Sequence, residues 1–262
     1  MDAKEGILHE IAYIERGYDV SVLFACESGS RAWGFASENS DYDVKFVYVR
    51  PISEYLLLEE PKDVIQWRIS AENSGMDNEF DSSGWDLRKF LRLLRNSNPS
   101  AVEWMCSEDV YLEDARFWRA RKLLDKCFDP VACAYHYYGM AIKTDLRHLE
   151  HDLVPVKGYL YAIRDAMAAR YTLLRLKPVP IAFRELMDTV LPRDFLPVVE
   201  ELLEMKQDGG GKRLTTHKKE LDDWILTEIN AVPETAGMMR RRERPEWDDF
   251  DAIFRNLVGL TL

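Results

Sequence analysis

The sequence has few cysteines, no long apolar run and no excess of basic residues. Its four cysteines are too irregularly spaced for a disulfide framework or a zinc ribbon, and we expect buried thiols. No apolar run reaches the roughly 18 residues that a transmembrane helix needs, and the N-terminus, with Asp2, Lys4 and Glu5, lacks a signal-peptide profile. These absences predict a soluble, cytoplasmic protein without a membrane partner.

Acidic residues outnumber basic ones, by 46 to 35, and the formal net charge is −11. Such a chain does not coat nucleic acid by charge alone, because non-specific binding needs cations that neutralise phosphates. The net charge does not exclude a local basic site for RNA or phosphate. The basic clusters are Arg88, Lys89, Arg92 and Arg95; Arg116, Arg119, Arg121 and Lys122; and the run 239–245, whose acidic sequel suggests a self-neutralising tail or docking segment.

The most informative stretch connects two apolar runs, 20–25 and 44–49, that predict strands. Gly29 and Ser30 form a turn after the first run. Gly29 would allow the backbone to approach a phosphate, and Ser30 offers a hydroxyl and an amide. This turn is therefore a candidate site for the triphosphate of a nucleotide.

An Asp-x-Asp pair, Asp41 and Asp43, enters the second predicted strand. Side chains alternate along a strand, so both carboxylates can point the same way, with Cα atoms about 6.6 Å apart. Mg²⁺ prefers oxygen ligands and often binds through one or two carboxylates plus substrate phosphates. The pair predicts a site for Mg²⁺ or Mn²⁺, although an isolated Asp-x-Asp is more often simply solvated.

The order strand, Gly-Ser, ten residues, Asp-x-Asp, strand resembles the DNA polymerase beta superfamily of nucleotidyltransferases. More closely, several segments resemble bacterial predicted nucleotidyltransferases related to the RNA-repair-pathway polymerase-beta-like proteins. Those segments are 29–35, 40–43, 49–51, 84–91 and 98–104. The resemblance covers residues 20 to about 107 by motif and is looser to about 175.

This resemblance implies transfer of a nucleoside monophosphate from a nucleoside triphosphate to an acceptor hydroxyl, with release of pyrophosphate. An RNA end, a protein side chain and a small molecule stay open as acceptors, and the choice of nucleotide, ATP included, stays open too. The alternative of another class is a catalytically silent nucleotide-binding or regulatory module with the same fold. A third possibility is an accidental motif in a helical interaction protein.

Superfamily members usually place a third acidic residue on a strand beside the Asp pair, where it acts as general base and metal ligand. The stretch 76–84 predicts a strand with Asp77, Glu79 and Asp81 on one face. We favour Asp81 because it lies nearest the family-like segment 84–86, with Glu79 as the alternative. Asp86 precedes apolar residues at helical spacing and is expected to cap that helix rather than bind metal.

Further nucleotide-binding candidates are basic or aromatic. Arg31 could add a cation to the phosphates, with an ion pair at the edge of the core as the alternative. Lys157, Tyr161 and Arg164 lie at four- and three-residue spacing on one predicted helix face, after Lys143 on the preceding helix. Such a face could grip a triphosphate and stack a base, or could be a solvated stripe.

Two predicted regions make the fold class α+β, a mixed-sheet nucleotidyltransferase core (1–110) followed by a helical bundle (111–262). The core combines a helix at 5–16, a strand at 64–70 and a helix at 87–96 with the strands above. The bundle is predicted to have helices at 113–126, 130–151, 157–176, 181–190, 194–206 and 215–231.

Three tryptophans, Trp33, Trp85 and Trp104, are expected in the core or in a pocket wall. The pair His148 and His151 is expected on a packed or solvated helix face, because two histidines without a third ligand rarely hold a metal. The glycine run 209–211 is expected to be a flexible connection.

Overall fold

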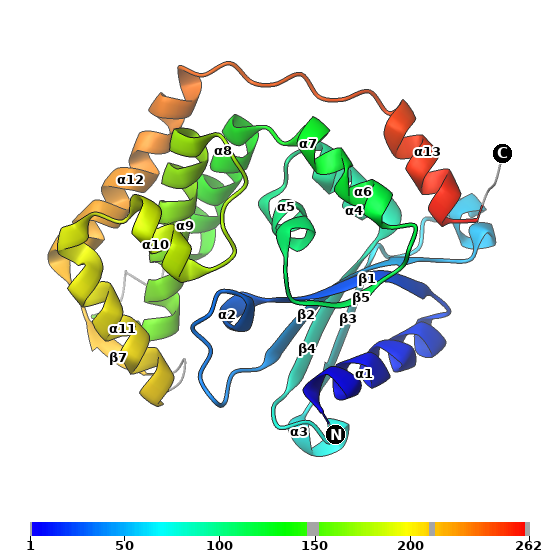
Figure 1. Cartoon of the computed structure of the whole chain (residues 1–262), viewed down its shortest axis with the longest axis horizontal. Coiled ribbons are helices and arrows are strands. Elements are labelled where there is room, and N and C mark those ends of the chain that lie inside the picture. Colours follow the sequence, from blue (N-terminus) through cyan, green and yellow to red (C-terminus); the bar gives the residue numbers. More distant parts are fainter. Residues whose placement is uncertain (1, 146–151, 210–212, 260–262) are drawn as a thin grey trace.

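A mixed five-stranded sheet is the centre of the N-terminal half in the computed structural model of this chain, which describes residues 2–145, 152–209 and 213–259. The strand order is β3-β4-β2-β1-β5, and β2 and β4 are parallel while the other neighbours are antiparallel (Figure 1). The strands are β1 (Ser21–Ser28), β2 (Tyr42–Val49), β3 (Val64–Ile69), β4 (Phe80–Asp86) and β5 (Val110–Glu113). The predicted α+β class with a mixed sheet is confirmed.

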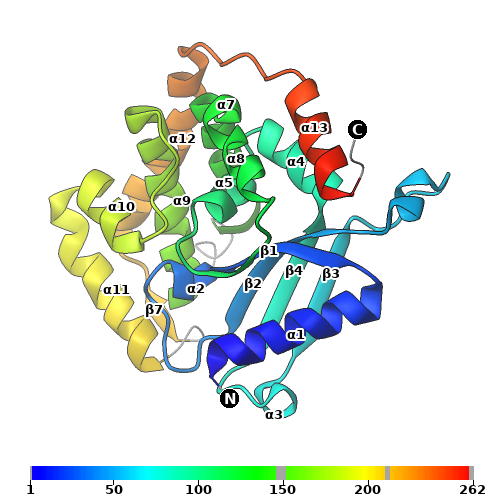
Figure 2. The same cartoon turned by 45° about the vertical axis from the view of Figure 1, so that its right-hand side comes forward.

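Helices cover both faces of this sheet, as Figure 2 shows. On one face lies α1 (Ala3–Tyr18), whose Ile7, Ile11 and Ile14 are buried at helical spacing against the strands. On the other face lie α4 (Leu87–Arg95), α5 (Pro99–Cys106) and the C-terminal α13 (Asp248–Leu257). Short helical segments connect these elements: α2 (Gly29–Ala32), η1 (Ile52–Leu56), α3 (Ala71–Ser74), α6 (Trp118–Arg121) and α7 (Leu123–Cys127).

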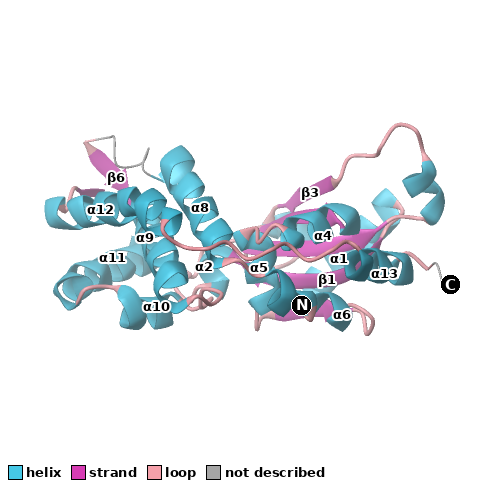
Figure 3. Ribbon diagram, turned by 90° about the horizontal axis from the view of Figure 1, so that it is seen from above, coloured by secondary structure: helices cyan, strands magenta, loops and turns pink. Residues whose placement is uncertain are grey.

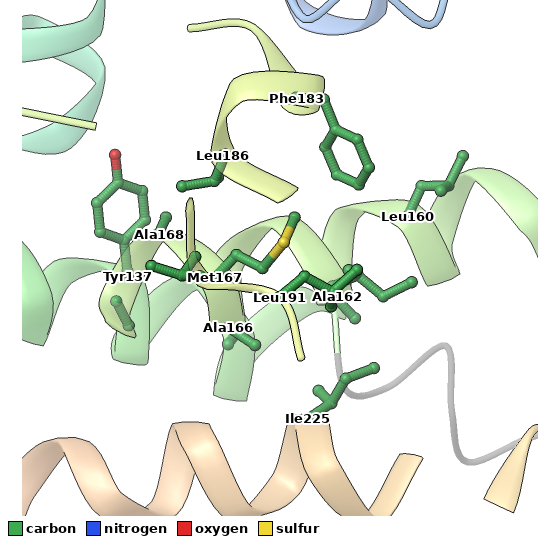
Figure 4. Packing of buried hydrophobic residues seen from close by; sticks show 14 of the residues in the cluster. Tyr137, Leu160, Ala162, Ala166, Met167, Ala168, Phe183, Leu186, Leu191 and Ile225 are labelled. Atoms are coloured by element: carbon green, nitrogen blue, oxygen red, sulfur yellow. The ribbon is translucent and has the colours of Figure 1, made fainter. Parts of the chain in front are cut away.

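A second layer of helices lies beside the sheet, at the left of Figure 3. The long helix α9 (Val156–Arg175) is its centre and is buried on most of its circumference by its neighbours. Figure 4 shows Leu160, Met167, Phe183 and Ile225 converging from three of these helices. The neighbours are α8 (Pro130–Met140) with a π-helical turn η2 (Ala141–Asp145), α10 (Phe183–Val190), η4 (Arg193–Phe195), α11 (Leu196–Gly209) and α12 (Lys219–Gly237), beside the short pair β6 (Leu153–Pro155) and β7 (Leu214–Thr216).

The helix predicted at 113–126 is wrong in extent. Its first residue, Glu113, instead ends the edge strand β5, and the next residue still pairs with β1 through the bond from Asp114 N to Leu23 O of 2.7 Å. Residues 118–127 form the two short helices α6 and α7.

Parts of the predicted bundle lie outside the described residues, namely His148 and His151 and most of the glycine run. The predicted helix 130–151 is α-helical only to Met140 and continues as the π-helical turn. The division at residue 110 remains a prediction, but β5 pairs with β1, and buried residues of α6, α7 and α13 belong to the core over the sheet. Leu124 of α7 also packs against the core of the second layer. In the described ranges no helix is long and apolar enough to cross a membrane.

Candidate functional site

The carboxylates of the Asp-x-Asp pair and the favoured third acid meet on one face of the sheet. Asp43, in β2, lies opposite Ser28 of β1 and opposite Asp81 of β4. Residues paired across a ladder point to the same face, so the parallel register places Asp43 and Asp81 side by side. Asp41 lies just before β2 and, like the other two, is partly exposed.

Gly29 fits closely against the Asp43 carboxylate. Its φ is +64°, in the left-handed region, and a Cβ at this position would lie 2.3 Å from Asp43 Oδ2. Both features require glycine. The Gly-Ser turn and the Asp-x-Asp pair, which the sequence predicted to be two halves of one site, are in contact in the structure.

The environment of Asp43 disfavours its negative charge. Burial raises the pKa of the Asp43 carboxyl, whereas the positive charges of Lys45 and Lys157 lower it. Asp81 and Asp41 raise the pKa further by repulsion. The position is thus suited to a bound cation, which would remove this cost.

Glu27 is a buried acid beside these carboxylates that was not predicted from the sequence. Its carboxylate accepts hydrogen bonds from the Asp43 backbone N–H, at 2.8 Å, and from the Tyr111 hydroxyl, at 2.5 Å. Burial raises the pKa of Glu27, against the effect of the Tyr111 bond. Glu27 therefore holds the backbone from which Asp43 projects.

Arg31 holds the loop between the two motifs. Its Nε and Nη2 donate to the carbonyl oxygens of Ser40 and Asp41, and its guanidinium lies 4.1 Å from the centre of the Tyr42 ring. These contacts give Arg31 a positioning role at Asp41. Its predicted contact with phosphate stays a prediction.

A lysine from the helical layer also reaches this loop. Lys206 of α11 is 3% exposed, and its Nζ donates to the hydroxyls of Ser37, at 3.2 Å, and Ser40, at 3.3 Å. Burial lowers the Lys206 pKa, and the nearby charge of Lys157 acts in the same direction. Across the described part of the chain, no acidic side chain forms an ion pair with Lys206.

A pocket of about 340 Å³ adjoins the carboxylates, and Ser28, Lys45 and Ser83 form part of its wall. The other wall residues include Trp33, Trp85, Trp104, Tyr161, Glu103 and Arg164. The prediction that the three tryptophans are core or pocket-wall residues is confirmed.

The predicted helix face on α9 contributes to this wall. Tyr161 contacts the Trp33 ring edge to face at 4.9 Å, and the Arg164 guanidinium lies 4.0 Å from the Trp33 ring centre. Lys157 Nζ lies 5.6 Å from the Tyr161 ring centre, so the three side chains share one face as predicted. Arg164 is buried and donates to Glu103 Oε1 at 3.1 Å.

Comparison with known proteins shows the family of this chain. The description "RNA repair pathway DNA polymerase beta family" belongs to a family profile that matches residues 3–256. The chain belongs to this family. It is also 35% identical to the uncharacterized protein YcgL of Bacillus subtilis (strain 168) over 257 residues, which is 97% of this chain and 96% of that relative.

In this polymerase-beta-like chain, the prediction that Asp77, Glu79 and Asp81 all lie on one strand is wrong for the first two. The strand begins at Phe80, so Asp77 and Glu79 precede it and only Asp81 belongs to the ladder. Residues 75–78 before the strand form a turn and a bend, and the bond from Tyr42 N to Glu79 O, at 2.8 Å, stands at the start of the parallel ladder between β2 and β4. Arg68 of β3 pairs with Glu79 at 2.9 Å and with Asp81 Oδ2 at 2.5 Å.

Asp86, at the other end of β4, caps α4 as predicted. Its Oδ1 accepts from Arg88 N at 2.8 Å, and its Oδ2 accepts from the Tyr55 hydroxyl at 2.9 Å. Both carboxylate oxygens are therefore used in structure. Lys143 is exposed on the π-helical turn, and its contact with nucleotide stays a prediction.

The donor set of this family member suits a divalent cation held jointly with substrate. Asp43 and Asp81 present carboxylate oxygens on one face, and Gly29 leaves the space beside Asp43 Oδ2 clear of a side chain. Among the described residues, no three His, Cys, Asp or Glu side chains form a metal site by themselves. Mg²⁺ commonly completes such a site with water and phosphate oxygens.

Proposed function

We propose that the protein is a metal-dependent nucleotidyltransferase that transfers a nucleoside monophosphate from a nucleoside triphosphate to an acceptor hydroxyl. The observation that carries this proposal is the register of Asp43 beside Asp81, with Gly29 against the Asp43 carboxylate. The family's description favours RNA as the acceptor, ahead of a protein side chain or a small molecule.

In this proposal the triphosphate lies along the turn at Gly29 and Ser30. The two backbone amides and the Ser30 hydroxyl donate to its phosphate oxygens. Lys157 and Lys143 add positive charge from the helical layer, while Arg31 and Lys206 hold the loop that carries Asp41. The substrate is thereby positioned between the sheet and the helices.

Asp41, Asp43 and Asp81 would hold Mg²⁺ or Mn²⁺. A bound divalent cation neutralises phosphate charge and lowers the pKa of the acceptor hydroxyl. The acceptor oxygen attacks the α-phosphorus, the bond to the leaving oxygen of pyrophosphate breaks, and the hydroxyl proton passes to Asp81 Oδ1. This is the Asp81 oxygen that Arg68 does not contact.

Lys45 is suited to stabilise the charge that builds up at the α-phosphate. It follows Asp43 by two residues on the same strand face and faces the Asp43 carboxylate. No ion pair engages Lys45 among the residues that the structure describes. An ammonium in this position stabilises a more negative transition state more strongly than the ground state.

A second candidate function is a catalytically silent nucleotide-binding module of the same fold. The observation that favours it is the Arg68 guanidinium paired with Asp81, because a cation on that carboxylate competes with metal. The two functions differ in whether the nucleoside monophosphate, with its α-phosphate, is transferred from the triphosphate to an acceptor.

The test is incubation of the full chain with Mg²⁺ or Mn²⁺ and each α-labelled nucleoside triphosphate, with and without mixed RNA. Asp43→Asn is the inactive variant, and Asp188→Asn, on the exposed side of α10, is the control. We expect label to reach RNA with the wild type and the control only. Metal-dependent triphosphate binding without label on any acceptor would overturn the proposal in favour of the silent module.

A further inference from the structure

The pocket beside the carboxylates is placed to hold part of a reactant. Ser28, in its wall, directly precedes Gly29. Lys45 and Ser83, also in its wall, follow Asp43 and Asp81 by two residues on the same strand faces. A group bound in this pocket could therefore belong to the same molecule as a phosphate or hydroxyl bound at the carboxylates.

Aromatic rings form two sides of this pocket. On the side of the sheet and α5, Trp85 stacks on Trp104 with ring centres 4.0 Å apart and planes at 28°. On the helical side, Trp33 is fixed by Tyr161 and Arg164. Each half-buried tryptophan is thus held by a second side chain, and its ring can receive a planar ligand with little loss of freedom.

Polar groups with unused hydrogen-bonding capacity lie between these rings. In the described ranges, the hydroxyls of Ser28, Ser83 and Ser100 make no hydrogen bond, and Lys45 makes no ion pair. Rings that provide apolar contact and hydroxyls that donate or accept together match a nucleobase, which has two apolar faces and a polar edge. An aliphatic ligand would leave the hydroxyls unsatisfied.

We propose that this pocket binds a nucleobase, stacked on the half-buried ring of Trp33 or Trp85 and hydrogen-bonded by the serines of the pocket. The inference rests on the proposed function, because the base belongs to one of the two reactants of nucleotide transfer. Its source is either the nucleoside triphosphate or the terminal nucleotide of an RNA acceptor, and both present the same chemistry.

The first arm of the test compares nucleoside triphosphates with tripolyphosphate, which has the phosphates but no base. Affinities are measured by titration calorimetry with Mg²⁺ for the wild type, Trp85→Leu and Ser100→Phe. Trp118→Leu, at a 45% exposed position on α6, is the control. Ser100→Phe fills the pocket without removing core packing, so it decides the matter if Trp85→Leu does not fold.

If the pocket holds the base of the triphosphate, the wild type binds at least one nucleoside triphosphate about tenfold or more tightly than tripolyphosphate. Both pocket variants then lose this advantage and keep the affinity for tripolyphosphate. The second arm compares a short RNA with the same RNA abasic at its 3′ end. If the pocket holds the acceptor base, the pocket variants lose the advantage in this arm instead.

Unchanged advantages in both arms, or no base-dependent advantage in the wild type, would overturn the inference. The proposed function fails separately. A wild type that transfers no label but loses a base-dependent affinity in the pocket variants would refute the transferase and keep the base site. Normal label transfer with unaltered nucleotide and RNA affinities in the pocket variants would refute the base site and keep the transferase.

Discussion

The sheet contributes the acids of the candidate site, and the helical layer contributes two of its lysines. Asp43 and Asp81 come from neighbouring strands, and a ladder of backbone hydrogen bonds sets their spacing. Lys157 and Lys206 come from helices whose positions depend on side-chain packing over a large core. The acids are therefore placed by local register, whereas the cations are placed only when the second layer has folded against the first.

The loop between the two motifs connects these regions. Phe35 of this loop belongs to the core of the helical layer and contacts Phe183 edge to face at 5.2 Å. The Phe183 backbone N–H donates to the Trp33 carbonyl at 2.9 Å, and Lys206 binds the hydroxyls farther along. The backbone that leads into Asp43 is thus held by contacts with two helices of the second layer.

Removal of an acid from the sheet should have the largest effect. Asp81→Asn should lower nucleotide transfer about a thousandfold, since a neutral amide neither accepts the acceptor proton nor matches a carboxylate as metal ligand. Glu79→Gln is the matched control, because Glu79 shares the Arg68 contact but lies outside the strand. Steady-state rates of label transfer check this, and a larger loss in Glu79→Gln would assign the third acid to Glu79.

Crowding of the Asp43 carboxylate by a new side chain at Gly29 should have the second-largest effect on nucleotide transfer. Gly29→Ala and Gly34→Ala both place a side chain at positive φ and should each cost about 1–2 kcal/mol of unfolding free energy. Only at Gly29 does the new Cβ meet Asp43, because nothing lies within 4 Å at Gly34. Urea denaturation should show similar losses of stability, while transfer should be lost in Gly29→Ala alone. Equal transfer rates in both variants would contradict the close fit of turn and carboxylate.

A change in the helical layer should have a smaller effect at the same site. Lys206→Met removes the ammonium that binds the Ser37 and Ser40 hydroxyls and should weaken nucleoside triphosphate binding about tenfold. Lys219→Met, at an exposed position of α12, should leave binding unchanged. Calorimetric titration of both variants measures the difference, and equal affinities would mean that the helices do not influence the loop.

The smallest predicted effect is a change in the pH dependence of stability. Because burial raises the Asp43 pKa, the folded protein holds this proton more tightly than the unfolded chain. Its contribution to stability is fully present below the ordinary pKa of 3.8 and is lost as the pH rises through the folded-state value. Without metal, the stability of the wild type relative to Asp43→Asn should therefore fall over this interval.

Asp114→Asn is the comparison variant, because the stability contributed by Asp114 changes with pH in the opposite direction. Hydrogen bonding to Arg116 lowers the pKa of Asp114, so its contribution is present above 3.8 and is lost as the pH falls. Denaturation midpoints between about pH 2 and 8 in the presence of a chelator compare the two variants, so that the intervals on both sides of 3.8 are covered. Parallel curves for the wild type and Asp43→Asn would contradict the unfavourable burial of this charge.

Local pattern predicted the strands β1 to β4, the motif turn and most helices. The apolar run 44–49 located β2, and the apolar spacing of residues 157–176 predicted α9 almost to its ends. The capping role of Asp86 also followed from position alone. The spacing of Phe250, Ile253, Phe254 and Leu257 would likewise have predicted α13, but the acidic residues around them suggested a tail.

Features that depend on distant pairing were not predictable. Arg68 and Asp81 meet only because β3 and β4 pair in one register. Lys206 follows Ser40 by 166 residues, and no spacing rule relates them. The strand Val110–Glu113 was likewise not predicted, because its pairing with β1 at the edge of the sheet joins distant parts of the sequence.

The joint use of acids and phosphates is tested most directly by Mn²⁺ binding. Free Mn²⁺ is measured by electron paramagnetic resonance with a non-hydrolysable nucleoside triphosphate, for the wild type, Asp43→Asn and Asp188→Asn. We predict tight Mn²⁺ binding by the wild type and Asp188→Asn that depends on the nucleotide, and a loss of at least tenfold in Asp43→Asn. Equal Mn²⁺ affinity in all three proteins would contradict the placement of the metal and nucleotide site at Asp43.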